Sequence, residues 1–140
     1  MSETLTVEKR FKANVQTVYE AWTDPSVFPQ WMGPGEVTCI KFESDFSIGG
    51  QYEIHMQTED GVKIAFGEYK EILPNEKLSF TWGWKGTELE GTLVELTFKS
   101  VEDETSLTLV HSGLPTKESA EHHTLGWNSS IDKLENFLNQ

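Results

Sequence analysis

The spacing of apolar residues changes several times along the chain. Leu5, Val7 and Phe11 fall on positions of the same parity, which is typical of a strand with one buried face. Residues 15–22 repeat instead with the period of a helix, and a period of two governs residues 37–112. The residues after this stretch have the helical period again. The pattern predicts a strand, helical segments, a run of strands and a final helix.

The first helical segment carries its own start and stop signals. Asn14 is a favourable N-cap residue, and a second short helix is predicted from Pro25 to about Trp31. The glycines in residues 33–35 end that helix. The apolar residues of the first helix lie three or four positions apart and form one face: Val15, Val18, Tyr19 and Trp22.

Six strands are predicted in residues 37–112, because turn-forming residues interrupt the alternation. Glycine accepts the positive φ that tight turns need, and Pro-Asn pairs favour turns. Short connections between successive strands imply an antiparallel meander. The predicted turns are at Gly49-Gly50, Asp60-Gly61, Pro74-Asn75, Lys85-Gly86 and Glu102-Asp103-Glu104.

The C-terminal helix is predicted to be long. Thr116 is its expected N-cap, and Glu118 lies in its first turn, where a negative charge is favourable. With more than 20 residues it would extend roughly 30 Å, so it must lie across a broad sheet to bury its apolar stripe. The stripe consists of Ala120, Trp127, Ile131, Leu134 and Leu138.

These elements predict an α+β fold with a single domain over residues 1–140. In this arrangement, a curved antiparallel sheet and two short helices enclose the long C-terminal helix. A curved sheet that grips a helix leaves space at one end, and such an apolar space is the default ligand site. The sequence therefore predicts a cavity between the sheet and the C-terminal helix.

Composition and charge narrow the classes of partner. The formal net charge is −12, which repels phosphate backbones and anionic membrane surfaces, so neither nucleic acid nor membrane is expected as a partner. There is no apolar stretch long enough to span a bilayer and no signal-peptide pattern, so we expect a cytoplasmic protein. The single cysteine, Cys39, cannot form an internal disulfide and is expected to be a small buried residue.

The histidines do not have the spacing of a metal site. His122 and His123 are adjacent and would point about 100° apart on a helix, and no cysteine pair accompanies them. We expect no metal and, without a glycine-rich phosphate loop, no cofactor. His111 and His123 are expected to face inward, where either could be a general base, but no acidic or nucleophilic partner is evident. No catalytic residue is therefore assigned.

Aromatic residues are the strongest functional feature of the sequence. Trp and Phe would supply apolar area and stacking, and Tyr52 or His111 would orient a ligand by a hydrogen bond. The alternative is a solid aromatic core. Trp84, near a strand end, could lie at the cavity mouth or at a dimer surface. The residues expected to contact a ligand are Trp31, Tyr52, Phe66, Phe80, Trp82, Phe98, His111, His123, Trp127 and Ile131.

Four short motifs, in this order, carry a resemblance to a known family. They are Ala21-Trp22-Thr23-Asp24-Pro25, Trp31-Met32-Gly33-Pro34, Gly49-Gly50 and Gly126-Trp127. Together they resemble the activator-of-heat-shock-protein-ATPase-like family, which belongs to the SRPBCC or START-like superfamily of the birch-pollen allergen. The resemblance extends from Leu5 to Leu138 and implies the helix-grip fold with a hydrophobic cavity. Two positions depart from the family pattern: Ser47 replaces a frequent arginine, and Met32 replaces an aromatic residue.

Three functions remain open at this point. The leading hypothesis is binding of a small hydrophobic or aromatic molecule in the cavity. The first alternative is a cyclase or hydrolase that uses the same cavity, because superfamily members include such enzymes. The second is a protein-interaction module, such as a homodimer or a co-chaperone-like partner. The family does not choose among them, since one fold hosts many activities.

Overall fold

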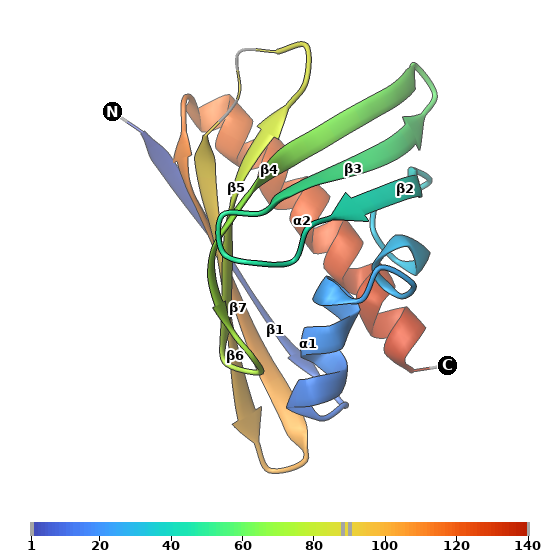
Figure 1. Cartoon of the computed structure of the whole chain (residues 1–140), viewed down its shortest axis with the longest axis vertical. Coiled ribbons are helices and arrows are strands. Elements are labelled where there is room, and N and C mark those ends of the chain that lie inside the picture. The colour runs from blue at the N-terminus through green and yellow to red at the C-terminus, as the bar shows by residue number, and fades with distance from the viewer. Residues whose placement is uncertain (1, 88, 90, 140) are drawn as a thin grey trace.

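The computed structural model describes residues 2–87, 89 and 91–139, and its strands form one antiparallel sheet that curves around a long helix (Figure 1). The two α-helices are α1 (Val15–Thr23) and α2 (Lys117–Leu138), and a 3-10 helix, η1, covers Phe28–Gln30. The strands are β1 (Glu3–Phe11), β2 (Thr38–Ser44), β3 (Gln51–Thr58), β4 (Gly61–Leu73), β5 (Lys77–Trp84), β6 (Thr92–Val101) and β7 (Glu104–Leu114).

The strand order confirms the predicted meander. Consecutive strands from β2 to β7 are neighbours, and the N-terminal strand β1 pairs with β7, so the order is β1-β7-β6-β5-β4-β3-β2. All pairs are antiparallel. β1 and β2 are therefore the two edges of the sheet, and each is paired on one side only.

The first helix begins as predicted, whereas the second is shorter than expected. The Asn14 side chain accepts a hydrogen bond from the Thr17 N–H at 2.8 Å and caps α1. Asp24 accepts from the N–H of Ser26, but the chain turns there, and only the 3-10 helix η1 follows. An α-helix that began at Pro25 would require a backbone donor at Pro29, which has none, and its ring would clash with the preceding turn.

The regular pairing of β4 with β5 is interrupted at Gly67 and Glu68. A Cβ atom at Gly67 would collide with the carbonyl oxygen of Thr81, so only glycine fits at this position. The hydroxyl of Tyr52, on β3, reaches across Gly67 and donates to the same carbonyl. The N–H of Glu68 bonds instead to the Thr81 hydroxyl at 2.9 Å. The sheet as a whole is curved, and α2 lies across its concave face (Figure 1).

Helix α2 is fixed to the rest of the molecule along its length. Thr116 caps its N-terminus by accepting from the Ser119 N–H at 3.0 Å. Near its C-terminal end, Lys133 donates to the carbonyl oxygens of Gly33, Gly35 and Val37 at 2.6, 3.2 and 2.9 Å. The apolar stripe of α2 is buried against the concave face, in one core with the inward side chains of the sheet.

None of the described helices is long and apolar enough to cross a membrane.

Cys39 is less buried than the sequence led us to expect. It lies on the edge strand β2 opposite Met56 and is half-buried rather than buried, and burial raises the pKa of its thiol. Its thiol contacts the Lys41 carbonyl oxygen at 3.5 Å.

Candidate functional site

A small cavity lies between the concave face of the sheet, α1, η1 and α2. Its volume is about 20 Å³, enough for one water molecule, whereas a cavity that binds benzene measures on the order of 150 Å³. The rings therefore nearly fill the space that the sequence led us to expect. Within the described part of the chain, eight of the ten lining residues are aromatic: Trp22, Phe28, Phe42, Tyr52, Ile54, Tyr69, Leu78, Phe80, Trp82 and Trp127.

The predicted ligand contacts divide into those at the cavity and those elsewhere. Trp31, for example, is buried but donates its indole N–H to the carbonyl oxygen of Ala21 at 2.9 Å. A role in ligand binding for such residues stays a prediction. The predicted residues that line the cavity are Tyr52, Phe80, Trp82 and Trp127. Those that are buried outside its wall are Trp31, Phe98, His111, His123 and Ile131.

The predicted inward position of Phe66 is wrong. In β4 the inner face carries Ala65, Gly67 and Tyr69, because these residues lie opposite the buried residues of β3 and β5. Phe66 lies opposite Glu53 on the outer face, where it is half-buried. The inner position at Gly67 must stay small because the Tyr52 side chain crosses over it.

Six lining residues were not among the predicted ligand contacts. Their periodicity did assign several of them to the core: Trp22 shares a helical face with Val18, and Ile54 shares the parity of Tyr52. Periodicity shows which face is buried, but it does not show which part of the core is hollow. The six residues are Trp22, Phe28, Phe42, Ile54, Tyr69 and Leu78.

Two of the tryptophans that line the cavity have an indole N–H without a hydrogen-bond acceptor among the described protein atoms. They are Trp22 on α1 and Trp82 on β5, and each side chain is 3% exposed. We call these two residues the unpartnered indole pair. A buried donor without a partner costs about 1–3 kcal/mol, and such groups are rare in folded proteins. The Tyr19 hydroxyl, one helical turn before Trp22, is buried in the same unpaired state.

His111 lies beside the cavity in a fully bonded state. The indole N–H of Trp127 donates to its Nδ1 atom at 3.1 Å, so Nδ1 must be the accepting nitrogen. The proton is then on Nε2, which donates to the Thr92 hydroxyl at 2.8 Å, and that hydroxyl donates to the Trp82 carbonyl oxygen at 2.7 Å. Burial, with a smaller contribution from His123, lowers the pKa of His111 to about 3. The imidazole is therefore neutral.

His123 on α2 repeats this arrangement. The Trp84 indole N–H donates to its Nε2 atom at 3.2 Å, which leaves the proton on Nδ1. Nδ1 then donates to the Ser119 carbonyl oxygen at 2.7 Å. Burial lowers the pKa of His123 as well. The rings of His111 and His123 lie 5.2 Å apart, and we call these two histidines with Trp84 and Trp127 the indole–imidazole cluster.

This cluster explains the position of Trp84 and weakens the hydrolase alternative. The Trp84 side chain faces α2 and is half-buried, rather than forming a surface for a partner. Both histidines already use their lone pair to accept an indole N–H, so neither is free to take a proton from a substrate. No carboxylate among the described residues bonds to His111 or His123. The cluster therefore gives a hydrolase mechanism no general base.

The tyrosine hydroxyls at the cavity are also bonded to protein atoms. Tyr52, which we expected to orient a ligand, donates its hydroxyl to the Thr81 carbonyl oxygen. The Tyr69 hydroxyl bonds to the Ser44 hydroxyl at 2.8 Å, and burial raises the pKa of Tyr69 to about 12. Both phenols are neutral at physiological pH. The donors left for a ligand are thus those of the unpartnered indole pair.

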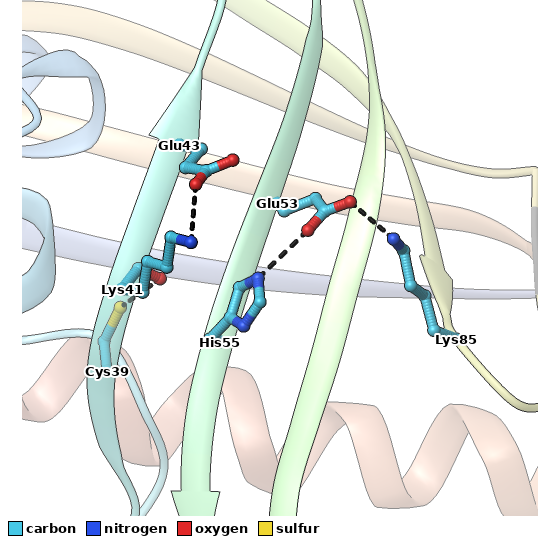
Figure 2. A network of polar contacts seen from close by, with 6 residues as sticks. All are labelled: Cys39, Lys41, Glu43, Glu53, His55 and Lys85. Atoms are coloured by element: carbon cyan, nitrogen blue, oxygen red, sulfur yellow. Dashed lines mark hydrogen bonds and ion pairs between the residues drawn. The ribbon is translucent and has the colours of Figure 1, made fainter.

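The outer face of the same strands is polar. Figure 2 shows Glu53 on β3 between His55, whose Nε2 lies 3.0 Å from its carboxylate, and Lys85. Lys41 pairs with Glu43 at 2.7 Å on the neighbouring strand. Hydrogen bonds from Lys85 and His55 lower the pKa of Glu53. Of these residues, Glu43, Glu53 and Lys85 border an open groove of about 710 Å³ that Phe66 also lines. The two carboxylates are paired with Lys41 and Lys85.

No group of three or more His, Cys, Asp or Glu side chains within the described residues is placed to hold a metal ion. The four histidines do not gather at one place. His55 is on the outer face, His111 and His123 are in the interior, and His122 is exposed. The expectation that the protein uses no metal or cofactor stays a prediction.

The sequence matches the family model of the Activator of Hsp90 ATPase homolog 1-like protein over residues 12–139. The chain belongs to this family. A comparison with curated proteins gave no match. The family assignment confirms the resemblance inferred from the four motifs.

Solved structures similar to this family member confirm its helix-grip α+β fold. Protein CV1439 from Chromobacterium violaceum is 24% identical, with a TM-score of 0.89 over 98% of this chain and 97% of that chain. The AHSA1 protein from Silicibacter pomeroyi is 24% identical, with a TM-score of 0.85 over 98% of each chain. DynU16, from the dynemicin biosynthetic locus, is 22% identical, with a TM-score of 0.82 over 98% of this chain and 47% of that chain.

Several residues of the motifs behind the resemblance have a clear structural role in this family member. Trp22 and Trp127 line the cavity, and their ring centroids lie 6.1 Å apart. Gly33 offers its carbonyl oxygen to Lys133, so the Gly-Pro segment joins α2 to the rest of the fold. A Cβ atom at Gly50 would collide with the Asp45 carbonyl oxygen, which explains the glycine before β3.

Proposed function

We propose that this protein binds a small apolar or aromatic molecule in the cavity between the sheet and α2. The observation that supports this function is the aromatic lining of the cavity, with eight rings around a space that side chains do not fill. Aromatic rings supply a large apolar area and favourable edge-to-face contacts to a planar ligand. Sites for small molecules are typically apolar, with few polar groups.

Binding requires the cavity to widen, because about 20 Å³ does not hold an organic ring. Helix α2 is an unfavourable element to displace, since Lys133 and the indole–imidazole cluster hold it at both ends. The opposite wall is formed by Phe28 on η1 and Phe42 on β2, whose ring centroids lie 4.5 Å apart. Because β2 is an edge strand paired only with β3, we assign the opening movement to this wall.

A panel of neutral one- and two-ring aromatics, including acetophenone and 2-acetylnaphthalene, tests this function by calorimetry, tryptophan fluorescence and melting temperature. A ligand at about 100 times its dissociation constant should stabilise the fold by roughly 2.7 kcal/mol. Failure of every compound to bind at millimolar concentration, to the native protein and to the widened variant described next, would contradict the proposal.

Two phenylalanine variants make this test specific to the cavity. Phe42→Ala removes a half-buried lining ring from an edge strand, so it should widen the cavity and tighten binding of the two-ring compound. Phe66→Ala removes a half-buried ring from the outer face and serves as the matched control, with unchanged affinity expected. Equal effects of the two variants would place the binding site elsewhere. The cytoplasmic location and the homodimer expected from the sequence stay predictions.

A further inference from the structure

The five tryptophans of the chain are not equivalent in their hydrogen bonding. Trp31, Trp84 and Trp127 each donate the indole N–H to a protein acceptor, at 2.9, 3.2 and 3.1 Å. The unpartnered indole pair, Trp22 and Trp82, is about as deeply buried as Trp31 and Trp127 but donates to no described protein atom. Both members of this pair line the cavity. Both tryptophans with an unused indole N–H therefore line the proposed binding site, whereas the Tyr19 hydroxyl, the third unpartnered group, belongs to a residue outside the cavity wall.

The unused groups at this site are donors, which determines what kind of ligand complements them. An indole N–H donates and cannot accept, so it is satisfied by an oxygen or nitrogen lone pair. Among the residues that the structure describes, those that line the cavity carry no formal charge. Burial of an anion or a cation there would be costly without an opposite charge, which leaves neutral acceptors.

We propose that the ligand is a neutral aromatic carbonyl compound whose oxygen accepts a hydrogen bond from the indole N–H of Trp22, Trp82 or both. This inference rests on the proposed function and adds the chemical class of the ligand to it. The aromatic part of the ligand contacts the rings of Phe80 and Trp127, which lie in the same wall. The carbonyl oxygen supplies the acceptor that the protein does not.

Acetophenone and α-methylstyrene form a matched pair of probes for this proposal. They have nearly the same shape and differ in an oxygen atom against a CH2 group, so only acetophenone offers an acceptor. Because the ketone is also better hydrated, the informative quantity is the ratio of the two affinities, compared between native protein and variants. Such a double-mutant cycle cancels the differences in size and solvation.

The variants Trp22→Phe and Trp82→Phe remove the N–H and keep an aromatic ring. Each should lower the ratio of ketone to hydrocarbon affinity by about 3- to 10-fold if its N–H bonds to the ligand, and at least one must do so. Trp31→Phe is the control, because its N–H is already bonded to Ala21, and it should leave the ratio unchanged. The two positions are tested separately so that one poorly folded variant does not decide the result.

The outcomes separate this inference from the function on which it rests. If both probes bind and the ratio stays constant in Trp22→Phe and Trp82→Phe, the cavity binds ligands without using these donors, and the inference is wrong. Tighter binding of phenyltrimethylammonium than of acetophenone would also overturn it, because a cation has no acceptor. If no probe binds to the native protein or to the widened variant Phe42→Ala, the proposed function itself fails.

Discussion

The indole–imidazole cluster and the unpartnered indole pair lie side by side in one core, yet they differ in how completely their polar groups are satisfied. In the cluster, each indole N–H meets an imidazole lone pair, and each imidazole N–H meets an oxygen. In the pair, two N–H groups meet no described acceptor. The Trp82 ring is only 5.0 Å from that of Trp127, so burial alone does not explain the contrast.

The contrast separates a structural role from a binding role. Fully bonded buried networks fix side chains in one arrangement, and unsatisfied buried donors lower stability until an acceptor arrives. The cluster accordingly fastens α2 to β5 and β7, whereas the pair is left for a ligand. Three changes test this division, beginning with the largest expected effect.

Truncation of Trp127, which belongs to the indole–imidazole cluster and also lines the cavity, should be the most damaging change. Trp127 is 4% exposed, lines the cavity and donates to His111. Trp127→Ala should lower the free energy of unfolding by about 3–5 kcal/mol, because it leaves a void and an unpaired imidazole nitrogen. Chemical denaturation measures this loss. A change below about 1 kcal/mol would show that the ring does not support the core.

Acid should destabilise the fold through the buried imidazole of His111. The pKa of His111 is about 3 in the folded protein and about 6.5 in the unfolded chain, so between these values the unfolded state binds more protons. Stability is therefore complete above pH 6.5 and falls as the pH decreases toward 3. From pH 7 to pH 5 the loss attributable to His111 should be about 2 kcal/mol.

The variant His111→Gln isolates this effect, since its amide can accept from Trp127 and donate to Thr92 without titrating. The loss between pH 7 and pH 5 should shrink by about 2 kcal/mol in this variant. His122→Gln, at an exposed position on α2, is the control and should keep the native pH dependence. If His111→Gln and the native protein lose the same stability, His111 is not held neutral.

The smallest expected effect is the difference in stability between the same substitution made in the indole–imidazole cluster and in the unpartnered indole pair. Trp127→Phe and Trp82→Phe remove the same atoms, but only the first leaves a buried acceptor, Nδ1 of His111, without its donor. Trp127→Phe should therefore cost about 1–2 kcal/mol more of unfolding free energy than Trp82→Phe. Denaturation midpoints of the two variants, compared with the native protein, measure the difference. Equal losses would mean that the Trp127 bond adds nothing.

Much of the fold could be predicted because local signals agreed with it. Asn14 and Thr116 cap α1 and α2 as expected, and the alternation after residue 37 produced the meander in the right order. The start of the second helix was misjudged because Pro29 forbids an α-helix that Pro25 would begin. Local patterns were reliable except where a nearby proline conflicted with the predicted element.

The site was harder to predict because it depends on contacts across strands. Phe66 had the alternation of an inward residue, but Tyr52 occupies the inner side of β4 above Gly67. Periodicity also could not distinguish Trp82, whose N–H is unpaired, from Trp84, whose N–H bonds to His123 on a helix far along the chain. Neither the cavity volume nor the state of each donor is encoded in spacing.

The most direct measurement of the central claim is the ¹H–¹⁵N NMR spectrum of the five indole N–H groups, assigned with single Trp→Phe variants and titrated with acetophenone. We expect the resonance of Trp22, Trp82 or both to move downfield on ketone binding, because a new acceptor deshields the proton. The resonances of Trp31 and Trp84, whose donors are already bonded, should move little. Saturating ketone that leaves Trp22 and Trp82 unchanged would contradict the account.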